Sequence, residues 1–177
     1  YTIDKSLTFF HEIEKGPLFG KTYLRFAKLL KAHGHYEEMQ QFKRMVLDDF
    51  ERLPETADVV ILVFDYEFGR RSFKNVKEST ADILRISRVA SKEQKLAIEK
   101  SLISSAKELQ DLVIKNKKSQ DVVLLSEPLA HLYDTFIKVV DSKDSRVYRA
   151  RYNLAETQFE IHHFAKATLN YRWITDN

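Results

Sequence analysis

The sequence contains no cysteine, and only four glycines and three prolines among its 177 residues. Without cysteine there can be no disulfide, no thiolate nucleophile and no zinc site built on thiolates. Glycine and proline are the residues that tight turns need, so their scarcity disfavours a protein made of many short strands. Long helices joined by short connections need few of either. The composition therefore favours an all-α fold.

Long apolar stretches and a strong charge imbalance are also missing. The longest apolar run, Val59–Phe64, is too short to cross a bilayer, so we expect no transmembrane segment. The 29 basic and 26 acidic residues leave a net charge of +3, which does not indicate nucleic-acid binding. With 44% apolar residues, we expect residues 1–177 to form a single domain. The chain begins at Tyr1 rather than at methionine, so we expect it to be a piece of a longer or processed chain.

Apolar residues recur with helical spacing along most of the chain, which predicts about eight or nine helices. Gly34 stands where a left-handed residue would end a helix, and Ser91 with Gln94 resembles a capping box at the start of another. From Ile98 to Val113 one apolar stripe follows that box. The predicted helices cover residues 3–15, 21–33, 36–53, 57–68, 72–88, 91–115 and 126–140, and two more lie within Tyr148–Ile174.

Two short runs leave the choice between helix and strand open. Val59–Phe64 and Val122–Leu125 are rich in residues that favour strands, and either could be a buried strand. Two short strands so far apart in the sequence would make a poor sheet, whereas buried helices tolerate such runs. We therefore favour helix for Val59–Phe64 and an all-α chain.

The segment Tyr148–Ile174 combines two amphipathic helical patterns, one directly after the other. Large and small apolar residues alternate along one predicted face of each helix. The first face carries Tyr148, Tyr152, Ala155 and Phe159, and the second carries Phe164, Ala167, Tyr171 and Ile174. We expect these faces to be buried and the segment to form a helical hairpin.

Residues 151–174 repeat the pattern of residues 23–46 at a constant offset. In both segments a large residue precedes a small one on the first helix, and an aromatic residue precedes a packing residue by three positions on the second. The matched pairs are Phe26 with Leu154, Ala27 with Ala155, Tyr36 with Phe164, Met39 with Ala167 and Val46 with Ile174. This pattern resembles that of the tetratricopeptide repeat family.

The resemblance implies a tetratricopeptide-like α-solenoid, in which antiparallel helical hairpins stack as a right-handed superhelix. Solenoids present a long groove whose side chains can vary without disturbing the core. The resemblance therefore implies a non-catalytic scaffold that binds a peptide or a partner protein. The run from Leu154 to Tyr171 is most similar to bacterial envelope members of the family, which favours the periplasm or envelope over the cytoplasm.

Sequence patterns typical of catalysis are missing. There is no glycine-rich phosphate loop, no His-Glu-x-x-His and no Gly-x-Ser-x-Gly. Glu160 and His163 have the spacing used in di-metal bundles, with Glu156 one turn earlier, but the second such pair is lacking. His162 and His163 fall at the turn between two predicted helices. We expect no enzyme, no metal and no cofactor, and a metal-dependent helical-bundle enzyme is the weakest alternative.

Basic residues gather in three short stretches, namely 70–77, 115–118 and 146–151. They could line one surface that receives an acidic peptide or RNA, although solvated helix faces are the simpler interpretation. Exposed aromatic residues are the other means of recognition, since aromatic residues and arginine dominate interface hot spots. Trp173 lies near the chain end, where a following helix would normally cover a stacked repeat.

These considerations give one set of candidate partner-binding residues and two hypotheses. A protein or peptide partner is favoured, and an RNA-binding helical array that uses the basic stretches is the second hypothesis. The candidate residues are Arg70, Arg71, Lys74, Arg149, Tyr152 and Trp173.

Overall fold

The computed structural model describes residues 5, 8–9, 12, 18–116 and 122–177. These residues contain eight α-helices, one short 3-10 helix and no strand, so the all-α prediction is confirmed for them, and Val59–Phe64 is helical. The helix predicted over 3–15 lies almost entirely outside them. The elements are α2 (Phe19–Ala32), α3 (Tyr36–Asp49), α4 (Pro54–Gly69), η1 (Phe73–Asn75), α5 (Val76–Ser87), α6 (Lys92–Lys115), α7 (Val122–Val139), α8 (Ser145–Glu160) and α9 (Phe164–Asp176).

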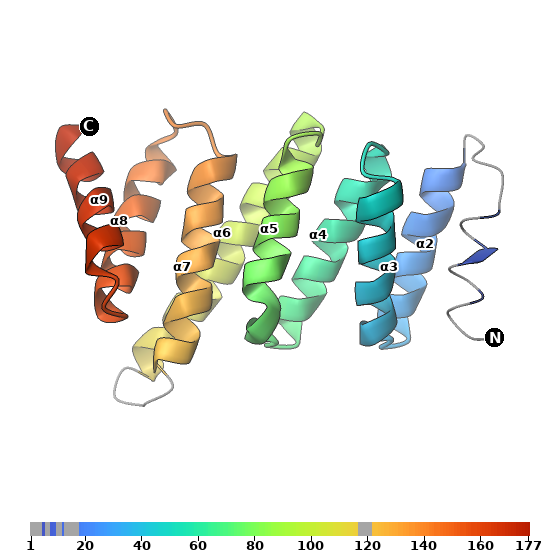
Figure 1. Cartoon of the computed structure of the whole chain (residues 1–177), viewed down its shortest axis with the longest axis horizontal. Helices are drawn as coiled ribbons and strands as arrows, with labels where there is room; N and C mark the ends of the chain where they lie inside the picture. Colours follow the sequence, from blue (N-terminus) through green and yellow to red (C-terminus); the bar gives the residue numbers. More distant parts are fainter. Residues whose placement is uncertain (1–4, 6–7, 10–11, 13–17, 117–121) are drawn as a thin grey trace.

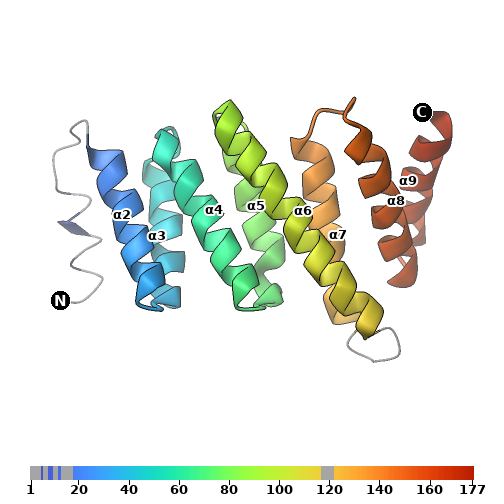
Figure 2. The ribbon, with the colours of Figure 1, turned by 180° about the vertical axis from the view of Figure 1, so that it is seen from behind.

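Successive α-helices run in opposite directions and form a row of hairpins in chain order (Figure 1). The helices α3, α5, α7 and α9 make the front layer in this view. The helices α2, α4, α6 and α8 make the second layer, which faces the viewer after a half turn (Figure 2). The two layers pack against each other along the whole row, and α2 and α9 lie at opposite ends.

Two hydrophobic clusters hold the layers together, and α4 contributes to both. The smaller cluster joins α2 and α3 to one side of α4, and includes Tyr23 and Val63. The larger cluster joins the other side of α4 to the helices from α5 to α8, and includes Phe64, Leu102 and Phe136. Because α4 is covered on two sides, its apolar residues do not form a single stripe. None of the helices in the described ranges combines the length and apolar character needed to cross a lipid bilayer.

The helix α6 forms as its sequence predicts. Ser91 accepts a hydrogen bond from the Gln94 amide at 3.2 Å, and the Ser91 amide donates to Gln94 Oε1 at 3.0 Å, which completes the capping box. The predicted apolar stripe is fully buried in the larger cluster; it consists of Ile98, Leu102, Ala106, Leu109 and Val113.

Of the helix starts that differ from the predictions, two involve proline. The helix predicted from residue 57 begins at Pro54, because proline fits the first helical position, where no amide partner is needed. The helix predicted from residue 126 begins at Val122, so that Pro128 lies inside α7. Proline leaves the carbonyl of Leu124 without its usual helical partner. Val122 and Leu125 pack against the larger cluster, and this burial offsets the loss.

The predicted faces of α8 and α9 are only partly correct. Ala155 and Ala167 are buried as expected, with 0% and 1% of their surface exposed. The aromatic residues beside them are not buried: each is about half exposed, namely Tyr148, Tyr152, Phe159 and Phe164. The buried side of α8 instead carries small and aliphatic residues, namely Val147, Ala150, Leu154 and Ala155, with Thr157 and Gln158.

Three turns at the lower edge of Figure 1 close with the same backbone hydrogen-bond pattern. Each has one residue in the left-handed region, namely Gly34 (φ 74°), Arg71 (φ 55°) and His162 (φ 61°). The next amide then donates to the carbonyl five residues earlier, as in a Schellman motif. The three bonds are His35 to Leu30 at 2.9 Å, Ser72 to Glu67 at 3.1 Å and His163 to Gln158 at 2.8 Å.

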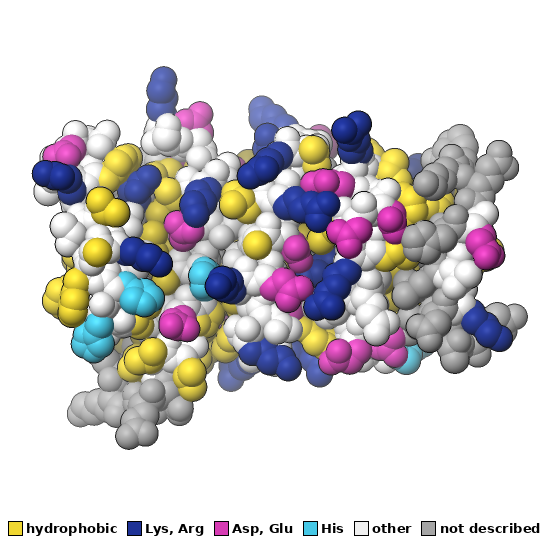
Figure 3. Space-filling view, in the orientation of Figure 1, with side chains coloured by type: hydrophobic (Ala, Val, Ile, Leu, Met, Phe, Trp, Pro, Cys, Tyr) yellow, Lys and Arg dark blue, Asp and Glu magenta, His cyan; other side chains and the backbone are white. Residues whose placement is uncertain are grey.

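Buried polar side chains join α3 to α4 and α5. Lys43 is buried, and its Nζ lies 2.6 Å from Asp82 Oδ2 on α5. Glu67 of α4 is also buried and accepts hydrogen bonds from Tyr36 at 2.6 Å and from Ser79. On the surface over these contacts, acidic and basic side chains are interspersed rather than gathered by sign (Figure 3).

Candidate functional site

A groove of about 680 Å³ runs between α6 and α8, on the side of the molecule that faces the viewer in Figure 2. We call it the α6–α8 groove. Both helices pack against α7, which closes the groove from behind. The residues that line it are Lys100, Ile103, Ser104, Lys107, Gln110, Asp111 and Ile114 of α6, Tyr133 of α7, and Arg146, Arg149, Ala150 and Asn153 of α8.

A hydrogen-bonded network fixes the floor of the groove. The Tyr133 hydroxyl donates to Gln110 Oε1 at 2.8 Å and accepts from Asn153 Nδ2 at 3.1 Å. Burial raises the pKa of Tyr133, while the hydrogen bond from Asn153 and the charge of Arg149 oppose that rise. The hydroxyl therefore stays neutral near pH 7. The network ties α6, α7 and α8 together at one point and gives the groove a rigid base.

The upper part of the groove, where α6 and α8 begin, is basic. Arg146 bridges the two helices, because its guanidinium donates to Glu99 at 2.7 Å and to Asp144 at 2.7 Å. Those hydrogen bonds, the one to Asp144 first, raise the pKa of Arg146. Lys100, Lys107 and Arg149 also line the groove, and among the described residues they form no ion pair. Three cationic groups there are therefore available to a ligand.

Smaller hollows continue the groove on both sides. One of about 480 Å³ lies between α4 and α6 and shares Lys100 and Ser104 with the groove. Asp65 lines this hollow; burial raises the pKa of its carboxyl group, and a hydrogen bond from Ser101 opposes that rise. The other hollow, of about 250 Å³, shares Gln110, Ile114 and Asn153 with the groove, and its further lining includes Tyr152, Glu156 and Glu160.

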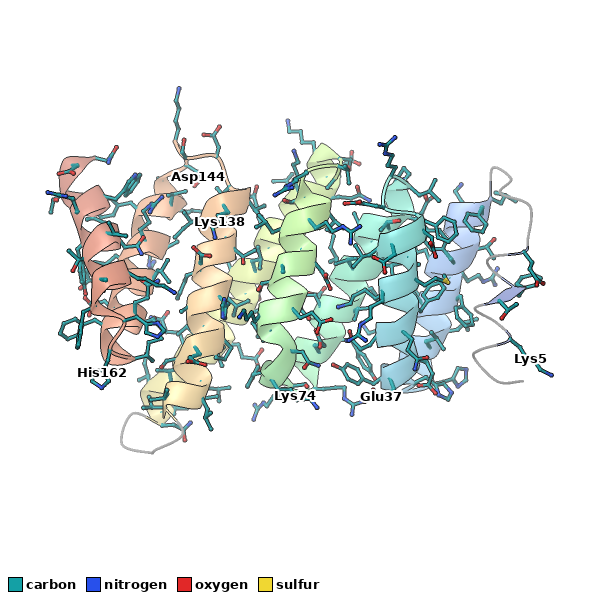
Figure 4. All side chains as sticks on the ribbon, in the orientation of Figure 1. Lys5, Glu37, Lys74, Lys138, Asp144 and His162 are labelled. Atoms are coloured by element: carbon teal, nitrogen blue, oxygen red, sulfur yellow. The ribbon has the colours of Figure 1, made fainter. Side chains whose placement is uncertain are left out.

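Three of the predicted partner-binding residues lie away from the groove. Arg70, Arg71 and Lys74 belong to the turn between α4 and α5, at the lower edge where Figure 4 labels Lys74. The Arg70 guanidinium lies over the Tyr36 ring, 5.0 Å from its centroid, and 5.7 Å from that of Tyr66. Arg71 occupies the left-handed turn position. Packing and turn geometry account for the positions of these two arginines.

The other three predicted residues lie on α8 and α9. Arg149 lines the α6–α8 groove, and Tyr152 lines the adjoining hollow. Trp173 is partly buried against the larger cluster, and the Arg151 guanidinium lies 4.3 Å from its ring centroid. The structure thus brings Arg149 and Tyr152 to one continuous surface and places Trp173 elsewhere.

The basic stretches do not form one surface. Residues 70–77 lie at the lower edge, around the Lys74 label of Figure 4, and Arg146 lies beside Asp144 at the upper edge. Lys115 ends α6 at the lower edge, and residues 117–118 are outside the described residues. Even within 146–151 the directions differ, since Arg151 turns to Trp173.

The histidines do not assemble a metal site in the described part of the chain. No group of three or more histidine, aspartate or glutamate side chains is placed there to hold an ion. Glu156 accepts a hydrogen bond from Tyr171. His162 and His163 lie at the turn that precedes α9, at the lower edge of Figure 4.

A further hollow, of about 650 Å³, lies beside the turn between α3 and α4. Four of its ten lining residues are acidic, namely Asp48, Asp49, Glu51 and Glu55. Arg85 donates to Glu51 at 3.0 and 3.1 Å and to Asp48 at 3.4 Å, so two of these carboxylates already have a partner. The hollow therefore lies beside the ion pairs through which Arg85 joins α5 to the end of α3.

Sequence reasoning missed the α6 half of the groove. Lys100, Lys107 and Ile114 recur at helical spacing on the side of α6 away from its buried stripe. Ile114 is a signal that could have found this face, because it is out of phase with the core stripe and is 62% exposed. The polar floor gave no such signal, since Gln110 and Asn153 meet only in the folded chain.

No protein-family model matches the chain, and no curated protein matches it either.

Proposed function

We propose that this chain is a non-catalytic interaction module that binds a segment of a partner protein along the face formed by α4, α6 and α8. The proposal includes a tetratricopeptide-like arrangement, in which the hairpins stack as a right-handed superhelix. The repeated turns at Gly34, Arg71 and His162 support it, because equivalent turns are what stacked equivalent hairpins require.

The continuity of the three hollows is the observation that carries the proposal. They share lining residues, so one bound segment can pass from the α4–α6 hollow through the α6–α8 groove without leaving the surface. The lining also has the composition of a recognition surface. Isoleucines and a tyrosine provide apolar contact, and unpaired cations and a fixed polar floor provide specificity.

An RNA-binding array draws little support from the arrangement of charge. Affinity for a phosphate backbone comes from many cations that follow one path. Here the basic stretches lie at the lower edge, at the upper edge and against Trp173, and acidic residues adjoin the groove at Glu156 and Glu160. A protein segment, which can carry both signs of charge, fits this mixture better.

Peptide selection with matched variants tests the proposal. A random peptide library is selected on the protein, and enriched peptides are measured on two variants. Ser104→Trp fills the point where the groove and the α4–α6 hollow meet, and Lys138→Trp places the same side chain on the front face, where Figure 4 labels Lys138. We expect Ser104→Trp to abolish binding and Lys138→Trp to leave it unchanged. No enrichment, or equal binding by both variants, would refute the proposal.

A direct measurement with RNA separates the rival hypothesis. A random single-stranded RNA is titrated at low and physiological salt. Binding that falls steeply with salt, together with a failure of peptide selection, would replace the proposed function by the RNA-binding one.

A further inference from the structure

The charges that line the α6–α8 groove are ordered along its length. Lys100 and Arg149 lie in the half of the groove nearer the starts of α6 and α8, and Lys107 lies midway along the α6 lining. Glu156 and Glu160 lie in the adjoining hollow, where α8 ends. Because α6 and α8 run in the same direction, residue order along both helices gives position along the groove (Figure 2). The lining is therefore basic at one end and acidic at the other.

The sign of the lining charge changes in the middle of the groove, between Lys107 and Asp111. The hydrogen-bonded network of Gln110, Tyr133 and Asn153 forms the floor there. Asp111 is the one acidic residue that lines the groove itself, and it stands on α6 one turn after Lys107. A negatively charged ligand group is therefore attracted on the side of this point towards Lys100, and a positively charged one on the side towards Glu160.

Apolar contact lies between and beside the charges. Ile103 and Ala150 line the basic half, and Ile114, which is 62% exposed, lines the junction with the acidic hollow. When an apolar ligand side chain covers an exposed isoleucine, the apolar surface removed from water makes binding more favourable. Ile114, and to a smaller extent the partly buried Ile103, supply affinity that does not depend on the sign of the ligand charge.

We infer that the groove selects a protein segment with an acidic end and a basic end, separated by apolar residues, and binds it in one orientation. The acidic end lies on Lys100, Lys107 and Arg149, and the basic end lies beside Glu156 and Glu160. From Lys100 to Ile114 the helix rises about 21 Å, which corresponds to six or seven residues of roughly extended chain. The inference rests on the proposed function and adds the chemistry and the direction of the bound segment.

Charge reversal at each end tests the inference with the peptides selected above. The basic-end variant is K107E/R149E, and the acidic-end variant is E156K/E160K. The control D134K/K138E reverses an exposed pair on α7 that lies outside the groove. We expect each groove variant to weaken binding about tenfold or more, since like charges replace opposite ones, and the control to bind as the native protein does. Circular dichroism and thermal melting confirm that all variants fold.

The orientation of the bound peptide is tested by exchanging the charges of the groove and those of the peptide together. The variant that carries all four groove reversals should bind a peptide whose acidic and basic ends are exchanged, and should bind the original peptide less well. Selected peptides without an ordered charge pattern, or peptides that the four-fold variant binds as tightly as the native protein does, would overturn the inference. If such peptides still fail to bind Ser104→Trp, the proposed function stands and only the inference about charge order fails. If no selected peptide depends on Ser104, the proposed function and the inference both fail.

Discussion

The buried ion pair between α3 and α5 should respond very differently to removal of its two members. Only 2% of the Lys43 side chain is exposed, against 19% of the Asp82 side chain. If Asp82 is replaced by leucine, the ammonium group stays buried without its counter-charge. If Lys43 is replaced by methionine, the carboxylate that remains can still reach water. The first change should therefore cost more stability than the second.

The expected magnitudes follow from that difference. Removal of one member of a buried pair costs about 3–5 kcal/mol when the other charge stays buried, which is the situation in D82L. For K43M, partial access of Asp82 to water reduces the loss to about 1–2 kcal/mol. The double variant K43M/D82L should be nearly as stable as the native protein or more stable, because apolar side chains of similar size fill the space without desolvated charge.

Urea unfolding of the four proteins in a double-mutant cycle measures these differences. The matched control is the pair of Arg44 and Glu78, whose side chains are 64% and 51% exposed and 3.3 Å apart. Its cycle should give a coupling free energy below about 1 kcal/mol. If D82L is no less stable than K43M, or if the double variant is the least stable protein, the buried-charge reasoning is wrong.

Three further predictions concern local features of the fold. His162→Gly should stabilise the chain by about 0.5–1 kcal/mol in thermal melts, because glycine adopts the left-handed conformation without strain. This is a net value, since glycine also raises the conformational entropy of the unfolded chain, which offsets part of the gain. Hydrogen bonds from the Arg146 side chain and amide lower the pKa of Asp144 from 3.8 to about 2. The ionised Asp144 carboxylate therefore stabilises the fold fully above about pH 4, and this stabilisation is lost as the pH falls towards 2. The variant D144N lacks this titrating group, so its stability should fall less than that of the native protein between about pH 4 and pH 2. Ala155→Leu should cost about 1–3 kcal/mol by overpacking, whereas Ala165→Leu at an exposed position should cost almost nothing in the same urea assay.

Helices with one-sided burial were predictable from the sequence. Ser91 and the stripe from Ile98 to Val113 are local signals, and both the cap and the buried face of α6 form as predicted. The start of α7 was not predictable in the same way. A proline at residue 128 normally marks a helix start, and only tertiary contacts of Val122 and Leu125 with the core reveal the extra turns.

The candidate site was less predictable, because it depends on which side of each helix has no neighbour. Tyr152 was expected to be buried more readily than exposed, yet it lines a hollow. Arg70 and Trp173 are of residue types that are common at interfaces, but each makes a cation–π contact within the chain. Periodicity identifies the apolar face of a helix, whereas the helices that flank its polar face are set by the arrangement of the whole row.

The shared turn geometry bears on how such a chain can diverge during evolution. The bonds that close the turns at Gly34, Arg71 and His162 all join backbone amides to backbone carbonyls. Selection can therefore replace the glycine at the cost of a small local strain and still keep the angle at which one helix returns along the other. The side chains at such a turn can therefore change while the hairpin persists. Hairpins of this kind are best compared by backbone conformation.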